Sequence, residues 1–178
     1  MNSSDDDKLV SERLPKMKII QGSIVAGAII YAIVAFASRE GGVMKGRAQE
    51  PIVSYACSVL AVISLMQFPF ITRKIAKENR RKILAEVRSG DSEEMKTVND
   101  TAFLLASYQT QMIIGAAILE GATFALIIAF LVDGTYWTLI GAAMISVVDA
   151  FQFPTRSRVE GWLSEQRELV EQERAGIA

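Results

Sequence analysis

One stretch limits what this chain can fold into more than any other. Residues 101–132, TAFLLASYQTQMIIGAAILEGATFALIIAFLV, contain a single charged residue, Glu120. As a helix this stretch would rise about 48 Å, which exceeds the ~30 Å hydrocarbon core of a bilayer. A charged carboxylate near the middle of such a span costs at least ~2.5 kcal/mol to insert. Glu120 therefore needs a partner, a proton or a function.

Three further apolar runs accompany this stretch. Apolar residues make up 51% of the 178 residues, and their arrangement in long runs is typical of membrane proteins. We expect an all-α membrane protein whose four transmembrane helices form two tandem hairpins in a four-helix bundle. Its expected parts are an N-terminal tail (1–18), a first hairpin (19–72), a charged helical segment (73–100), a second hairpin (101–155) and a C-terminal helix (156–178).

The N-terminal tail is polar and acidic. A cleaved signal peptide would have a short basic leader and a small-residue cleavage site after a short apolar core. Here the apolar run covers residues 19–38 and is followed directly by Arg39 and Glu40. We interpret the run as a retained transmembrane helix, and the acidic residues 5–7 as part of a solvated, frayed tail.

Lysine and arginine are distributed unevenly between the two sides of this arrangement. The tail, the segment between the hairpins and the C-terminal region carry 16 of them, and the two hairpin loops carry 3. The positive-inside rule then places both termini in the cytoplasm; in a bacterium the membrane would be the inner one. The basic segment 73–82 is typical of an interfacial helix that binds anionic lipid headgroups. No nucleic-acid-binding module accompanies it, so we expect no nucleic-acid partner.

The two halves of the sequence resemble each other. Residues 19–27, IIQGSIVAG, align with residues 113–121, IIGAAILEG, and the tripeptide Gln-Phe-Pro occurs at 67–69 and again at 152–154. We expect an internal duplication whose halves are related by a pseudo-two-fold axis along the membrane normal. The prolines are expected to turn each second helix from the membrane onto its surface. The alternative is that the glutamines line a polar entry.

The second hairpin carries two acids at matched depth. Glu120 precedes Gly134 by 14 residues and Asp149 follows it by 15, so both carboxyls would lie about 20 Å from the outer end of an antiparallel hairpin. Thr123 and Ser146, one turn away, can supply hydroxyl partners. Two carboxylates close together in a low dielectric cannot both stay ionised. The four residues therefore predict a site that shares a proton or holds a cation.

The surroundings of Glu120 also resemble those of a known family. Residues 113–132, IIGAAILEGATFALIIAFLV, place the glutamate before small residues and a Leu/Ile/Val run. The stretch is similar to the ion-binding helix of the proteolipid c subunits of vacuolar-type rotary ATPases. That resemblance implies that the family's ion-binding carboxylate corresponds to Glu120. This chain differs in carrying the glutamate on the expected third helix, where the family has it on the fourth, and in its charged segment between the hairpins.

Enzyme motifs are absent from the sequence. It has no P-loop, no GxSxG and no histidine, so we expect no catalytic residue, cofactor or metal. The single cysteine, Cys57, lies in an apolar run and is expected to be a buried, unreactive thiol.

Two functional hypotheses remain. The first is a proton- or cation-binding membrane subunit that uses Glu120 and Asp149. The second is a structural or assembly protein in which these acids are only polar contacts between helices. Its cytoplasmic helices, 73–87 and 159–173, would bind each other or a partner. The partners left open, besides the lipid bilayer, are a second copy of the chain and another membrane protein.

Overall fold

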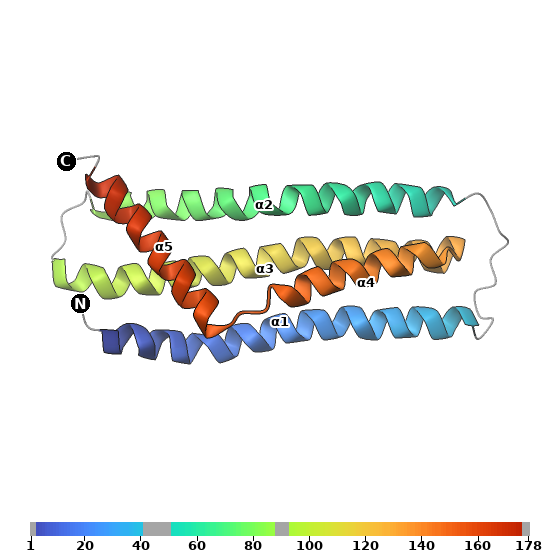
Figure 1. Ribbon diagram of the computed structural model, residues 1–178, viewed down its shortest axis with the longest axis horizontal. Coiled ribbons are helices and arrows are strands. Elements are labelled where there is room, and N and C mark those ends of the chain that lie inside the picture. Colours follow the sequence, from blue (N-terminus) through green and yellow to red (C-terminus); the bar gives the residue numbers. More distant parts are fainter. Residues whose placement is uncertain (1–2, 41–50, 88–92, 176–178) are drawn as a thin grey trace.

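The computed structural model describes residues 3–40, 51–87 and 93–175, and all regular secondary structure in these ranges is α-helical. The helices are α1 (Ser3–Glu40), α2 (Ile52–Val87), α3 (Glu93–Asp133), α4 (Tyr136–Phe151) and α5 (Arg156–Ala175) (Figure 1). Three helices are long and apolar enough to cross a membrane, and the number rises to four if α4 and α5 form one bent span. The expected all-α class is confirmed, and several long apolar helices fit an integral membrane protein.

The central helix of the bundle is α3. It contacts α1, α2 and α4, whereas the described parts of α1 and α2 do not contact each other. Figure 1 shows α1 and α2 on opposite sides of α3. Half of the apolar window of α3 is buried, against 17% of that of α1 and 11% of that of α2. The longest apolar stretch of the chain thus forms the axis around which the other helices pack.

The outer faces of α1, α2 and α4 are apolar as well. Soluble monomers rarely expose contiguous apolar surfaces larger than a few hundred Å². Here large apolar side chains stand exposed along all three helices, and lipid is the environment that suits them. Examples are Ile30 and Ile33 on α1, Val59 and Val62 on α2, and Ile140 and Met144 on α4.

Two clusters of buried apolar side chains fill the interior. The first cluster joins α1, α2, α3 and α4 near the turn between α3 and α4, and it consists of Ala35, Ala61, Leu119, Ala122, Leu126, Ile127, Phe130, Ala142 and Ile145. The second cluster lies at the other end of the bundle and joins α1, α3 and α5 through Val10, Met17, Leu104, Leu105, Val159, Leu163 and Val170. The bundle therefore has an apolar core at each end.

The N-terminal tail is more ordered than its sequence indicated. Helix α1 begins at Ser3 and runs without interruption into the first apolar run. Val10 and Met17 are 3% and 1% exposed and belong to the second cluster. The prediction that residues 5–7 fray was wrong, because they lie within α1. Two apolar side chains on one helical face, two turns apart, pack the following turns against α3 and α5.

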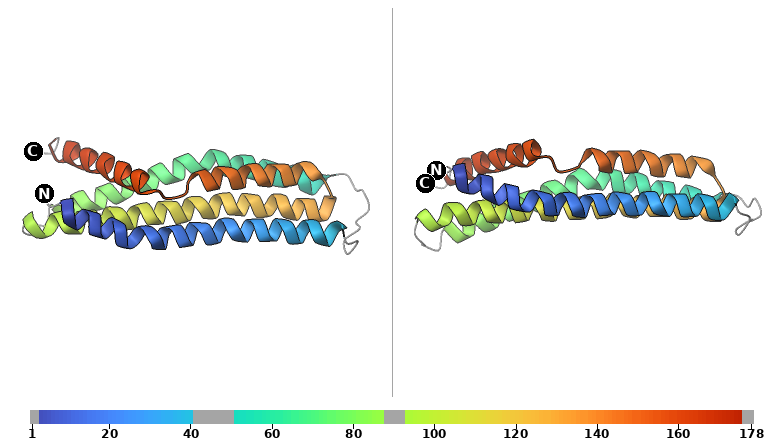
Figure 2. Two further views of the ribbon diagram at one scale, coloured as in Figure 1. Left: turned by 60° about the horizontal axis from the view of Figure 1, so that its bottom comes forward. Right: turned by 90° about the horizontal axis from the view of Figure 1, so that it is seen from below.

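The two Gln-Phe-Pro tripeptides have different structures. At the second, α4 ends at Phe151 and the chain bends by 69° before α5 begins. At the first, α2 continues through Pro69 to Val87, and the Thr72 hydroxyl donates a hydrogen bond to the Phe68 carbonyl at 3.0 Å. Figure 2 shows α2 curved along its length. The expected turn out of the membrane direction is present at the second tripeptide and absent at the first.

The two halves of the chain also differ in length and packing. Helix α2 has 36 residues and α4 has 16, which correspond to about 54 Å and 24 Å. Helices α3 and α4 contact each other, whereas the described parts of α1 and α2 do not. The beginning of α1 and the end of α5 lie at the same end of the bundle (Figure 1). The internal duplication and the four separate spans stay predictions.

Candidate functional site

Three polar side chains meet between the two apolar clusters, and we call them the interior site: Gln21 on α1, Glu120 on α3 and Asp149 on α4. Gln21 is 1% exposed and Asp149 is 5% exposed. The Gln21 amide Nε2 donates a hydrogen bond to Asp149 Oδ1 at 2.8 Å. Buried polar groups need partners, and this bond ties α1 to α4 across the bundle.

Glu120 faces the same space from α3. Its carboxyl is half-buried and close enough to Asp149 for the two groups to interact electrostatically. A Cβ placed on Gly27 would lie 3.8 Å from Glu120 Oε1, so the carboxyl points at the backbone of α1. The absence of a side chain at Gly27 leaves the room that this carboxyl occupies. The structure thus brings together the two acids that the sequence predicted at matched depth.

The interior site has more hydrogen-bond acceptors than donors. Two carboxyl groups and the Gln21 carbonyl oxygen are acceptors when the acids are ionised. The Gln21 Oε1 atom is buried without a partner. Within the described ranges, no lysine or arginine forms an ion pair with Glu120 or Asp149. The Gln21 amide N–H group is the one donor that a side chain supplies to either carboxyl in this part of the structure.

The two predicted hydroxyl partners bond elsewhere. Thr123 Oγ1 donates to the Leu119 carbonyl at 3.0 Å, and Ser146 Oγ donates to the Ala142 carbonyl at 3.0 Å. Each hydroxyl has one hydrogen, and here it is used within the residue's own helix. Both residues stay near the acids by sequence, yet neither donates to a carboxyl.

Sequence reasoning missed Gln21 as a member of this site. The signal that could have found it is a lone amide side chain near the start of an otherwise apolar run. Such polar residues in membrane helices usually face the bundle interior, where they hydrogen-bond across helices. Its partner on α4 could not be identified without knowing that α1 packs beside α4.

A second polar group, which we call the outer cluster, lies where α3 turns into α4. Arg39 Nη1 donates to the carbonyls of Phe130 and Leu131 at 3.0 Å and 2.9 Å. The guanidinium also lies 5.4 Å from the centre of the Phe130 ring. Gly134 has a φ of +75°, the left-handed conformation in which α3 ends. A cation therefore caps the last carbonyls of α3, where the helix dipole is negative.

The remaining members of the outer cluster are paired in the same way. Asp133 Oδ2 accepts a hydrogen bond from the Ser54 backbone N–H at 2.6 Å, in the first turn of α2. The Ser54 and Thr135 hydroxyls share a hydrogen bond. The Tyr136 hydroxyl donates to Glu40 Oε1 at 2.8 Å. Each of these charges has a donor, an acceptor or a helix terminus beside it.

The charged extensions at the other end contact one another. Arg80 on α2 donates to Gln166 Oε1 on α5 at 2.7 Å, and its Nε lies 3.6 Å from Glu173 Oε1. Arg156 forms an ion pair with Asp7 of α1 at 3.0 Å. The basic end of α2 and helix α5 therefore pack within one chain.

The remaining candidate ligands give no metal site. No group of three His, Cys, Asp or Glu side chains in the described ranges could hold a metal ion. Cys57 is a free, half-buried thiol that packs against the first apolar cluster. No protein-family model, curated protein or solved structure matches the chain.

Proposed function

We propose that this protein is a membrane subunit that binds a proton or a small cation at the interior site. Glu120 and Asp149 are the ligands, and Gln21 positions Asp149. The excess of acceptors over donors carries the proposal. A buried acceptor without a donor, such as Gln21 Oε1, costs roughly 1–3 kcal/mol. A proton on one carboxyl or a cation among the oxygens supplies what this chain's side chains leave out.

The surroundings of the site favour a mobile occupant over a fixed ion pair. The two apolar clusters lie on either side of it along the bundle and keep the local dielectric low. In such surroundings two neighbouring carboxylates repel strongly unless a proton or cation lies between them. Glu120 is only half-buried, so its carboxyl stays within reach of exchange from outside the bundle. The resemblance of residues 113–132 to an ion-binding proteolipid helix supports the same assignment for Glu120.

A second function is favoured by a different observation. Arg80 joins α2 to Gln166 and Glu173 of α5, and the Gln21–Asp149 bond joins α1 to α4. In a structural or assembly protein these contacts would only fix the bundle, and the acids would be polar contacts between helices. The two functions differ in one respect: a structural carboxyl needs its shape and hydrogen bonds but has no need to titrate.

Carbodiimide labelling separates these functions, because the reagent attacks protonated carboxyls in apolar surroundings. We expect the reconstituted protein to be modified at Glu120, and we expect Glu120→Gln to abolish the reaction. Asp149→Asn should change the rate of modification at Glu120, because it removes the neighbouring charge. Glu40→Gln is the matched control: Glu40 lies in the outer cluster with Tyr136 as its partner, and its replacement should leave the labelling unchanged.

The same assay identifies the occupant. Labelling that falls as the pH rises at constant salt indicates a proton. Labelling that falls on addition of Na⁺ or K⁺ at constant pH indicates a cation. Two results would contradict the proposed site and favour the structural function. Either Glu120 is not labelled, or its labelling rate is the same in Asp149→Asn as in the parent protein.

A further inference from the structure

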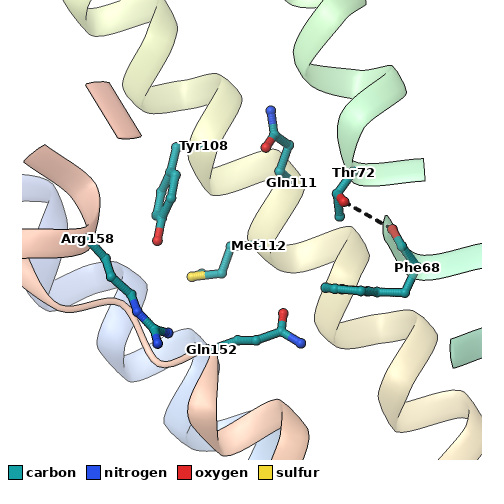
Figure 3. A pocket seen from close by; sticks show the side chains of 7 residues that line it. All are labelled: Phe68, Thr72, Tyr108, Gln111, Met112, Gln152 and Arg158. Carbon is teal, nitrogen blue, oxygen red and sulfur yellow. Dashed lines mark hydrogen bonds between the residues drawn. The ribbon is translucent and has the colours of Figure 1, made fainter. Parts of the chain in front are cut away.

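An open cavity of about 220 Å³ lies where α2, α3 and the junction between α4 and α5 meet. Figure 3 shows Tyr108, Gln111 and Met112 reaching it from α3, with Phe68 facing them from α2 and Gln152 and Arg158 at the α4–α5 junction. The two Gln-Phe-Pro tripeptides thus contribute one side chain each, Phe68 from the first and Gln152 from the second. No residue that lines this cavity is acidic.

The wall of the cavity contains a buried amide, that of Gln111, whose nitrogen has no partner among the described residues. Gln111 is 9% exposed, and its Nε2 has no hydrogen-bond partner in the described part of the structure. An unsatisfied buried amide is costly, so such a group indicates a ligand or ordered water. Gln152 offers a second amide to the same space, and Tyr108 offers a hydroxyl.

The positively charged side chain of Arg158 also lines the cavity. Arg158 lies close enough to Tyr108 to act on it electrostatically. Its guanidinium donates to the Phe151 carbonyl, and it forms no ion pair with any carboxylate of the described residues. Arg156, two residues earlier, is paired with both Glu160 and Asp7. Arg158 is therefore the arginine at this junction whose charge remains available to a ligand.

The depth of the cavity suits a lipid headgroup. Helix α4 is about 24 Å long and ends at Phe151, where the apolar sequence gives way to the charged residues of α5. The cavity lies just beyond the end of α4, at the level where α2 passes from its apolar run to Arg73. Its walls are mixed: the Phe68 ring packs where a Cβ on Gly115 would lie 2.7 Å from Phe68 Cε2, and Met112 lies beside it.

We propose that this cavity binds the phosphate group of an anionic phospholipid. Arg158 supplies the charge, and the amides of Gln111 and Gln152 and the Tyr108 hydroxyl donate hydrogen bonds to the phosphate oxygens. Phe68 and Met112 contact the glycerol and the upper part of the acyl chains. This site is separate from the basic segment 73–82, where attraction to headgroups would be non-specific. Inorganic phosphate shares this chemistry, and the lipid is favoured because the cavity lies at the headgroup level and has apolar walls.

Tryptophan fluorescence provides the test, because the Trp162 ring lies 5.2 Å from the Tyr108 ring at the edge of the cavity. The chain has two tryptophans, so a Trp137→Phe background leaves Trp162 as the only tryptophan whose emission is followed. The protein is reconstituted in phosphatidylcholine vesicles that contain a small fraction of phosphatidylglycerol with brominated chains, which quench a nearby indole. Brominated phosphatidylcholine at the same fraction is the reference lipid. We expect stronger quenching by the anionic lipid.

Three variants assign that preference to the cavity. Arg158→Gln should reduce the preference roughly fivefold, the effect of removing one basic side chain at a lipid surface. Arg156→Gln removes the same charge from the same helix, but its arginine is already paired with Asp7 and Glu160, so the preference should change less than about twofold. Gln111→Leu keeps the net charge and should still weaken the preference, because it removes the buried donor.

Three results would overturn the proposal. Equal quenching by both brominated lipids would show that no anionic headgroup is selected. Equal losses for Arg158→Gln and Arg156→Gln, with Gln111→Leu silent, would reduce the effect to general surface charge. Relief of quenching by millimolar inorganic phosphate, at an ionic strength held constant with chloride, would assign the cavity to phosphate from solution.

Discussion

The outer cluster and the interior site contain similar polar groups, but they differ in whether those groups have partners within the protein. In the outer cluster, Arg39 lies on the last carbonyls of α3, and Asp133 accepts from the first turn of α2. In the interior site, the Gln21 amide donates to Asp149 only, and Gln21's own oxygen has no partner among the described residues. Where the chain satisfies its charges, the charges fix the structure. Where it leaves acceptors unsatisfied, the proton or cation that we propose would complete the site.

The largest loss of stability is expected from Arg39→Ala. The substitution removes two charged hydrogen bonds to the carbonyls of Phe130 and Leu131, together with the favourable charge at the end of α3. We expect the free energy of unfolding in detergent micelles to fall by about 2–3 kcal/mol. Arg73→Ala, which removes an exposed arginine of α2, is the control and should cost less than ~0.5 kcal/mol. Equal losses would mean that the outer cluster does not stabilise the bundle.

A smaller loss is expected from Gly134→Ala. Gly134 has a φ of +75°, where an L-residue is strained by roughly 1–2 kcal/mol, and a Cβ there would collide with the Arg39 guanidinium. Gly121→Ala is the matched control, because that glycine is helical and open space surrounds its missing Cβ. Thermal unfolding should show the first variant less stable and the second as stable as the parent or slightly more so. The reverse order would contradict the described turn.

The sequence predicted the parts of this fold that depend on length, apolar runs and spacing. Residues 101–132 were expected to form a long apolar helix, and they form most of α3. The pairing of helices could not be predicted, because apolar faces that are exposed to lipid and apolar faces that pack on other helices have the same composition. The central position of α3 between α1 and α2 follows from contacts that no local pattern contains.

The candidate site was predictable to the same degree. Matched distances from Gly134 placed Glu120 and Asp149 together, since the geometry of an antiparallel turn depends only on residue count. The hydroxyls of Thr123 and Ser146 were expected nearby as donors, but both bond their own helices, as such residues often do in membrane helices. Gln21 was missed because its role depends on the packing of α1 against α4.

Within the interior site, Gln21→Leu should cost about 0.6–1.7 kcal/mol of unfolding free energy, because it removes a hydrogen bond between membrane helices. Asp149→Asn should cost less, since the asparagine oxygen can still accept from Gln21. Unfolding in detergent micelles measures both variants under the same conditions. If Asp149→Asn were as costly as Arg39→Ala, the ionised carboxylate itself would be structural, and the contrast between the two polar regions would fail.

The central claim is that the interior site takes up a species that the chain does not provide, and infrared difference spectroscopy tests it most directly. Spectra of the reconstituted protein are compared across a pH change and across addition of Na⁺, and the carbonyl stretch of a protonated carboxyl is followed. We expect one such carboxyl per chain to respond to at least one of these changes, and its band to disappear in Glu120→Gln/Asp149→Asn while Glu40→Gln retains it. A band that persists in the double variant, or a parent protein that shows no responsive carboxyl, would contradict the claim.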